Sequence, residues 1–170
     1  MAKYLQIDDD GILTEVQPTA IGGSASYAEQ MVQLDASGNL DESMMPTGIS
    51  AHTVTVTATE GLSAGDIINL YDNSGTASAR KADGGTNQYP AHGYVKATVT
   101  SGASATVYFN GSNAGSFDAS AVGSSVFLSD TPGGETITPL TTSGYLHQKI
   151  GIVESLTSYA FRPESAIKLV

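Results

Sequence analysis

The chain contains one stretch of sequence twice, and this duplication limits the folds it can adopt. The first copy reads Gly65-Asp-Ile-Ile-Asn-Leu-Tyr-Asp72 and then Pro90-Ala-His-Gly-Tyr-Val95; the second reads Gly123-Ser-Ser-Val-Phe-Leu-Ser-Asp130 and then Gln148-Lys-Ile-Gly-Ile-Val153. Five identities recur at one spacing, the 58 positions from Gly65 to Gly123. Each copy closes on a third apolar segment, Ala105–Phe109 or Tyr159–Phe161. Such a unit cannot bury its own apolar face, so we expect the two to pack together.

From residue 51 onward the apolar residues recur with a period of two. Thr53–Thr59 places Val54, Val56 and Ala58 on one face. Further core positions are expected at Ile68, Leu70, Val95, Ala97, Val99, Ala105, Val107, Phe109, Val126, Leu128, Ile150 and Ile152. Short strands separated by Gly/Asn/Asp/Ser/Pro clusters predict an all-β domain, an antiparallel β-sandwich or barrel built from two pseudo-repeated units at about 62–109 and 120–161. Gly93 and Gly151 predict a bulge or a tight bend at matching places.

The first 50 residues differ from the rest in charge and pattern. They contain eight acidic residues against Lys3 alone, a charge of −7 out of −10 for the whole chain. Tyr4–Ile7 and Ile12–Val16 flank an Asp-Gly pair, which predicts a small hairpin. The remaining apolar clusters have no sustained period. We therefore expect an extended N-terminal arm over 1–50, ordered by lying on another surface, ahead of a β domain over 51–170.

Composition excludes several classes of protein. With 17 acidic and 7 basic residues, the chain is repelled by phosphate backbones and anionic membranes, so we expect neither partner. It has no cysteine, which excludes disulfides and thiolate sites. The N-terminus lacks the apolar run of a signal peptide, and no segment approaches the roughly 20 apolar residues that span a bilayer. We expect a soluble protein made in the cytoplasm.

No residue pattern predicts a metal site or a cofactor. His52, His92 and His147 are too scattered for zinc, and the P-loop, dinucleotide-binding and Gly-x-Ser-x-Gly motifs are absent. Asp8-Asp-Asp-Gly11 lacks the alternating ligands of a calcium loop. Asp35-Ala-Ser-Gly-Asn-Leu-Asp41 does alternate its oxygens, which favours an Asx-type turn and leaves a cation shared between subunits as the alternative.

Carboxylates and tyrosines define two further alternatives. One is a glycosidase-like pair, as in a depolymerase fragment, drawn from Asp66, Asp72, Asp118 and Asp130. Two of these, Asp72 and Asp130, recur at matched turns, which favours backbone capping, and we expect no enzyme activity. The other is a glycan-binding groove lined by Tyr71, Tyr89 and Tyr108, although tryptophan, the usual stacking platform, is absent.

Two motifs resemble virion structural proteins of tailed bacteriophages, specifically the small head decoration (cement) proteins. The first is the doubled pattern of Gly65–Val95 and Gly123–Val153, which looks like a β unit of capsid-decorating and fibre-associated proteins. The second is Met31-Val-Gln-Leu-Asp-Ala-Ser-Gly-Asn-Leu-Asp-Glu-Ser-Met-Met-Pro46, similar to a connector in phage fibre and head proteins. Together they cover about two-thirds of the chain.

The resemblance implies an all-β homotrimer that binds the major capsid protein on the exterior of the virion head and stabilises the shell. It also implies an N-terminal arm that grips the shell or a neighbouring subunit. The residues expected at that contact are the apolar ones of the arm: Tyr4, Leu5, Ile7, Ile12, Leu13, Val16, Met31, Leu34, Met44 and Met45. The alternative is a head- or tail-fibre or receptor-binding module that recognises host-surface glycans.

Overall fold

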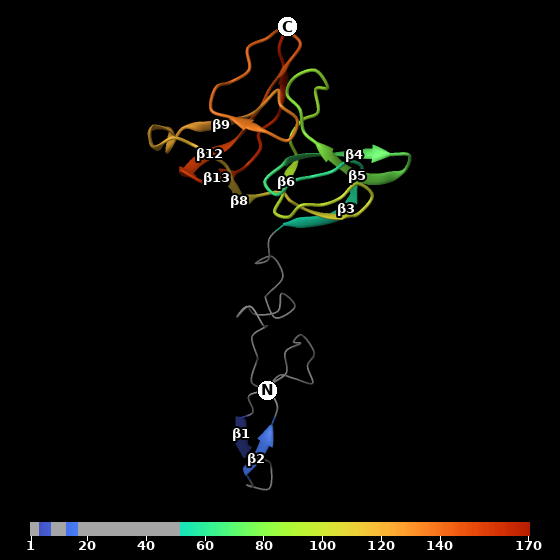
Figure 1. Ribbon diagram of the computed structural model, residues 1–170, viewed down its shortest axis with the longest axis vertical. Helices are drawn as coiled ribbons and strands as arrows, with labels where there is room; N and C mark the ends of the chain where they lie inside the picture. The colour runs from blue at the N-terminus through green and yellow to red at the C-terminus, as the bar shows by residue number, and fades with distance from the viewer. Residues whose placement is uncertain (1–3, 8–12, 17–51) are drawn as a thin grey trace. The chain divides into compact units, whose positions relative to one another are not determined.

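A computed structural model describes residues 4–7, 13–16 and 52–170 of the chain (Figure 1). The chain divides into two compact units, Met1–Ser50 and Ala51–Val170, and each is considered by itself. Of the N-terminal unit, the structure describes two strands, β1 (Tyr4–Ile7) and β2 (Leu13–Val16). They pair antiparallel, with Tyr4 opposite Val16 and Ile7 opposite Leu13, which is the hairpin that the sequence predicts. The rest of the predicted extended arm lies outside the described residues.

The first copy of the repeat is a closed five-stranded barrel. Its strands are β3 (Thr53–Ala58), β4 (Ile67–Asn73), β5 (Thr76–Lys81), β6 (Gly93–Val95) and β7 (Ser104–Tyr108). They follow the order β3-β5-β4-β6-β7, and β7 returns to pair with β3. Closure depends on β3 and β5, which pair in parallel through Thr57 opposite Ser78 and Ala58 opposite Ala79. In Figure 1 this barrel is the green-to-yellow half of the domain.

The second copy forms an open five-stranded sheet in the order β10-β9-β12-β13-β8. Its elements are β8 (Gly111–Ala114), the short 3₁₀ helix η3 (Ala119–Ala121), β9 (Ser125–Leu128), β10 (Glu135–Thr136), β12 (Lys149–Ser155) and β13 (Ser158–Phe161). A separate pair joins β11 (Leu146–His147) to β14 (Ile167–Lys168), close to the C-terminus. All these sheet pairings are antiparallel.

The two copies share one design, strand for strand. The order β5-β4-β6-β7-β3 in the barrel corresponds to β10-β9-β12-β13-β8 in the open sheet. Hydrogen bonds recur at the same 58-residue spacing: Gly65 N–H donates to Val95 O at 2.8 Å, and Gly123 N–H to Val153 O at 3.0 Å. Both glycines have a positive φ, +94° and +84°, which other residues rarely adopt. The repeated glycine and valine therefore preserve one backbone geometry.

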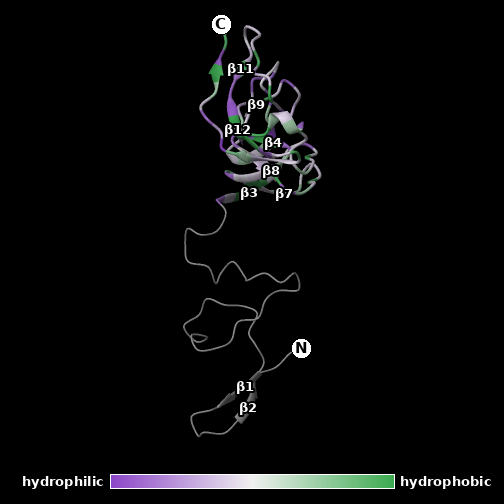
Figure 2. Cartoon of the chain, turned by 90° about the vertical axis from the view of Figure 1, so that its left-hand side faces the viewer, coloured by the Kyte–Doolittle hydropathy of each residue, from purple (hydrophilic) through white to green (hydrophobic). Residues whose placement is uncertain are grey.

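Side chains of the first copy alternate between two faces of its strands, and each face packs into a different hydrophobic core. Ile68 and Val95 point into the barrel, whose buried core also contains Val56, Ala58, Leu62, Ala79, Ala105 and Val107. Their neighbours Ile67 and Tyr94 belong to the other core, with Val126, Leu128, Ile150, Val153, Tyr159 and Phe161 of the second copy. The outer face of β4 and β6 thus fills the open side of the second sheet, and green hydrophobic stretches run along strands such as β12 (Figure 2).

The prediction of an all-β fold from two repeated units is confirmed, with corrections in detail. One pairing departs from the antiparallel arrangement, because barrel closure brings β3 and β5 together in parallel. Ala97 is exposed, because β6 already ends at Val95. Ile152 is 46% exposed, because a register shift between Lys149 and Gly151 changes which residues of β12 point inward.

The matched glycines Gly93 and Gly151 are required by close packing between strands. A Cβ on Gly93 would lie 2.7 Å from Tyr108 O, and one on Gly151 would lie 2.2 Å from Ala160 O. The predicted irregularity is present at Gly151, where the β12–β9 register shifts. The glycine lets β7 approach β6 in the first copy and β13 approach β12 in the second. This close contact explains why glycine recurs at the position.

Candidate functional site

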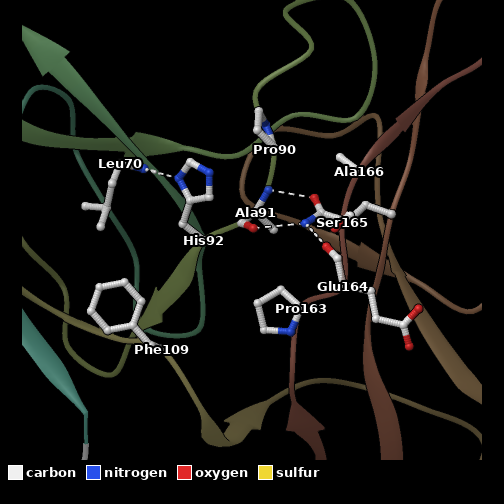
Figure 3. A pocket seen from close by; sticks show the side chains of 10 residues that line it. Leu70, Pro90, Ala91, His92, Phe109, Pro163, Glu164, Ser165 and Ala166 are labelled. Carbon is white, nitrogen blue, oxygen red and sulfur yellow. Dashed lines mark hydrogen bonds between the residues drawn. The ribbon is translucent and has the colours of Figure 1, made fainter.

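A cleft of about 620 Å³ lies where the two copies meet (Figure 3). The first copy contributes Leu70 of β4, Phe109 after β7 and the segment Pro90–His92. The second contributes Gln148 and the segment Pro163–Ala166 that follows β13. The lining is mostly apolar, with the His92 ring on one wall. Both copies therefore contribute to this concave feature.

Gln148 holds the floor of the cleft together. It is buried (3% exposed), and its Oε1 accepts from Ala91 N–H at 2.7 Å. Its Nε2 donates to Ala91 O at 3.0 Å and to Glu164 O at 2.8 Å. One amide therefore satisfies both backbone groups of Ala91 and ties the first copy to the C-terminal segment of the second. At the equivalent position, 58 residues earlier, the first copy has Pro90.

His92 is neutral in this arrangement. Leu70 N–H donates to His92 Nδ1 at 3.0 Å, so Nδ1 carries no proton and Nε2 does. Burial lowers the pKa of His92, because the charged imidazolium is poorly solvated there. Glu164 lines the same cleft, but its carboxylate lies 3.6 Å from Lys149 Nζ. The site thus presents one imidazole N–H donor and an apolar wall, without an acid–base pair.

The other two histidines lie in surroundings different from those of His92. His52 packs on Phe109 with ring centroids 4.6 Å apart, and His147 packs near Phe127 at 5.2 Å. Within residues 4–7, 13–16 and 52–170, no cluster of three or more metal-ligating side chains occurs.

The four aspartates have different hydrogen-bonding surroundings. Asp66 accepts from Ser63 N–H and pairs with Lys81 at 3.1 Å. Asp72 accepts from Gly75 N–H at 2.9 Å, which is the predicted turn capping. At the matched turn, Ser129 Oγ rather than Asp130 accepts from the backbone, and Asp118 precedes η3 without a capping hydrogen bond.

The predicted tyrosine groove is not assembled. Arg80 lies between Tyr71 and Tyr89, with its guanidinium 4.1 Å and 3.3 Å from the two ring centroids. Tyr108 instead stacks on Tyr94 at 5.5 Å, with Lys96 Nζ 4.6 Å from its ring. One face of each of these three rings is therefore occupied by a cation of the same chain.

Sequence reasoning missed the residues that order the loop before the cleft. Asp83 is buried, and its carboxylate accepts from Gly85 N–H at 2.7 Å and from Asn87 Nδ2 at 2.7 Å. Arg80 Nε donates to the buried Asn69 Oδ1 at 2.9 Å. Asn69 in turn donates to Pro90 O at 2.8 Å. An Asx-turn pattern over Asp83-Gly-Gly was the available signal.

The predicted arm residues are only partly described. Tyr4, Leu5 and Ile7 lie on β1, and Leu13 and Val16 on β2. The others lie outside the described residues: Ile12, Met31, Leu34, Met44 and Met45. The candidate cation loop at Asp35–Asp41 lies outside them as well. In the part of the chain that the structure describes, no helix is long and apolar enough to cross a lipid bilayer.

Comparison with known proteins identifies no family for this chain. No protein-family model matches the chain, and no curated protein matches it. Among solved structures, the chain is similar to the head fiber gp8.5 N base of bacteriophage phi29, with 14% sequence identity and a TM-score of 0.39. That alignment covers 66% of this chain and 94% of the other. A likeness at this level is too distant to assign a family or a role.

Proposed function

We propose that this chain is a structural protein of a tailed-bacteriophage head, which decorates the outer capsid surface as a homotrimer and is anchored through its N-terminal unit. The observation that carries the proposal is the two-stranded hairpin of β1 and β2. Among the described strands, β1 and β2 pair only with each other. A two-stranded hairpin is marginally stable in water at best, so it gains most from pairing with a partner surface.

The chemistry of the N-terminal segment suits such a partner. Its −7 charge is attracted to basic patches, and its apolar clusters and exposed strand edges suit addition to a neighbour's sheet. Each hairpin binds weakly, but three arms on one trimer raise the effective affinity without new contacts. The phage resemblance of the 31–46 connector, which follows the hairpin, supports the same role.

The β domain has the properties of a rigid architectural body. Its two copies share a core and are joined by buried hydrogen bonds such as those of Gln148. Among the described residues, every buried side-chain polar atom has a hydrogen-bond partner. We propose that the domain stands on the shell while the arm makes the attachment, and that it has no catalytic role.

Shell binding tests the proposal directly. Capsid shells made from the major capsid protein of the same genome are mixed with the full-length chain and sedimented. The Leu5→Asp/Ile7→Asp variant is expected to lose at least about tenfold in affinity, because each charge opposes burial of the hairpin. The matched control is Ile137→Asp, an exposed residue of the β domain (45%), which is expected to bind normally.

Two results would sink the proposal: equal binding of the two variants and the parent chain, or no shell binding by any of them. Light scattering of the full-length chain checks the trimer separately. The glycan-binding alternative is less well supported, since Arg80 covers one face of Tyr71 and one face of Tyr89. Binding to a glycan array that disappears in Tyr89→Ala would favour that alternative.

A further inference from the structure

The two copies satisfy one equivalent backbone donor in different ways. In the second copy, Leu128 N–H donates to the backbone carbonyl of Gln148 at 2.9 Å, which extends the β9–β12 ladder. In the first copy the equivalent donor is Leu70 N–H, 58 residues earlier, and it donates to the His92 imidazole at 3.0 Å. The carbonyl of Pro90, which would match that of Gln148, accepts from Asn69 Nδ2 instead. A side chain therefore replaces a backbone acceptor in the barrel.

This replacement makes one ladder bond of the barrel dependent on protonation. An imidazole nitrogen accepts a hydrogen bond only while it is unprotonated, whereas a peptide carbonyl stays an acceptor at every pH used for proteins. The second copy has Ile150 at the position of His92, fully buried and without a titratable group. The duplicated unit thus contains a titratable version and a non-titratable version of the same bond.

Among the groups around the cleft, the His92 imidazole is the one whose protonation changes the hydrogen bond to Leu70. Of the other residues that line the cleft, Glu164 carries a carboxylate, and it is paired with Lys149 at 3.6 Å. From the β4–β5 side, Arg80 is held by Asn69 and by the rings of Tyr71 and Tyr89. Pro90, Ala91, Phe109, Pro163, Ser165 and Ala166 bring no charge to the cleft.

We propose that His92 is an acid-sensitive latch at the junction of the two copies. Uptake of one proton from solvent at Nδ1 removes the acceptor of Leu70 N–H and replaces it with a second donor. The β4 edge of the barrel loses a ladder bond, and the imidazolium turns toward water in the cleft. The second copy keeps its ladder. Acidification therefore loosens the barrel side of the cleft selectively.

Amide hydrogen exchange of the full-length chain measures the latch, with Leu128 as the internal control. Between pH 7 and pH 5, and after correction for the intrinsic rate, Leu70 is expected to lose protection by about tenfold, because the opened segment binds the proton more tightly than the closed one. Leu128 is expected to keep its protection. In His92→Asn, the side-chain carbonyl replaces Nδ1 with an acceptor that does not titrate, so Leu70 should stay protected at both pH values.

The pH profile of thermal unfolding gives a second readout. Because burial lowers the pKa of His92 in the folded state, its contribution to stability is complete above the unfolded value of 6.5. It is lost as pH falls below that value. His92→Asn should remove this slope, whereas His52→Asn and His147→Asn should keep it. Unchanged Leu70 protection at pH 5 in the parent chain, or an unchanged slope in His92→Asn, would overturn the proposal.

Discussion

The two copies of the repeat keep the same strand order but complete their cores differently. The first closes on itself through the parallel β3–β5 pair, and β5 has six residues. In the second copy the corresponding β10 has two residues, and the sheet stays open. Ile67 and Tyr94 of the first copy fill that open side. Duplication has therefore produced one self-contained unit and one that needs its partner.

Among the predictions, substitution of the matched glycines Gly93 and Gly151 should cause the largest loss of stability. A Cβ on Gly151 would meet the backbone oxygen of Ala160 at 2.2 Å, so Gly151→Ala is expected to cost at least about 4 kcal/mol, since backbone yields little to overpacking. The Cβ added in Gly93→Ala would lie 2.7 Å from Tyr108 O, so we expect the next largest loss of stability there. Urea denaturation checks both. Gly61→Ala, where nothing lies within 4 Å, is the control and should be near neutral.

Hydrogen exchange after truncation of Ile67 tests whether the second copy depends on the first. Ile67→Ala should cost about 3 kcal/mol through the cavity it leaves, and the loss of protection should extend to β9 and β12. Ile68→Ala removes the same atoms from the barrel core, so it should affect β3 and β7 instead. Identical exchange patterns in the two variants would contradict the division into two cores.

The smallest of these effects is expected at Gln148. Gln148→Leu keeps the volume but leaves Ala91 N–H and O without partners, so we expect a loss of about 2 kcal/mol. Exchange at Ala91 should rise by more than at Leu128, whose ladder bond uses the backbone of residue 148. The control is Thr136→Val at an exposed turn bond. If Gln148→Leu were as stable as the parent, the amide would not join the copies.

Prediction from sequence succeeded where the cause is local. Alternation identified β3 and the inward positions Val56 and Ala58, and the Asp-Gly pair marked the β1–β2 hairpin. Failures came from interactions between distant segments. Phe109 is only half-buried, because it lies beyond the end of β7 and packs on His52. The Tyr71–Tyr89 pair is filled by Arg80, and no spacing rule indicates that contact.

Local patterns in the sequence are enough to predict an all-β domain over 51–170, a doubled unit, and glycines and valines that recur in it at one spacing. These follow from period, turn chemistry and spacing, which are properties of neighbouring residues. Contacts between distant strands determine that one copy closes and the other is filled by it, and that His92 takes the place of a backbone carbonyl. Alternation of apolar residues predicts which side chains are buried. The core in which each one is buried depends on the packing of strands that are far apart in the chain.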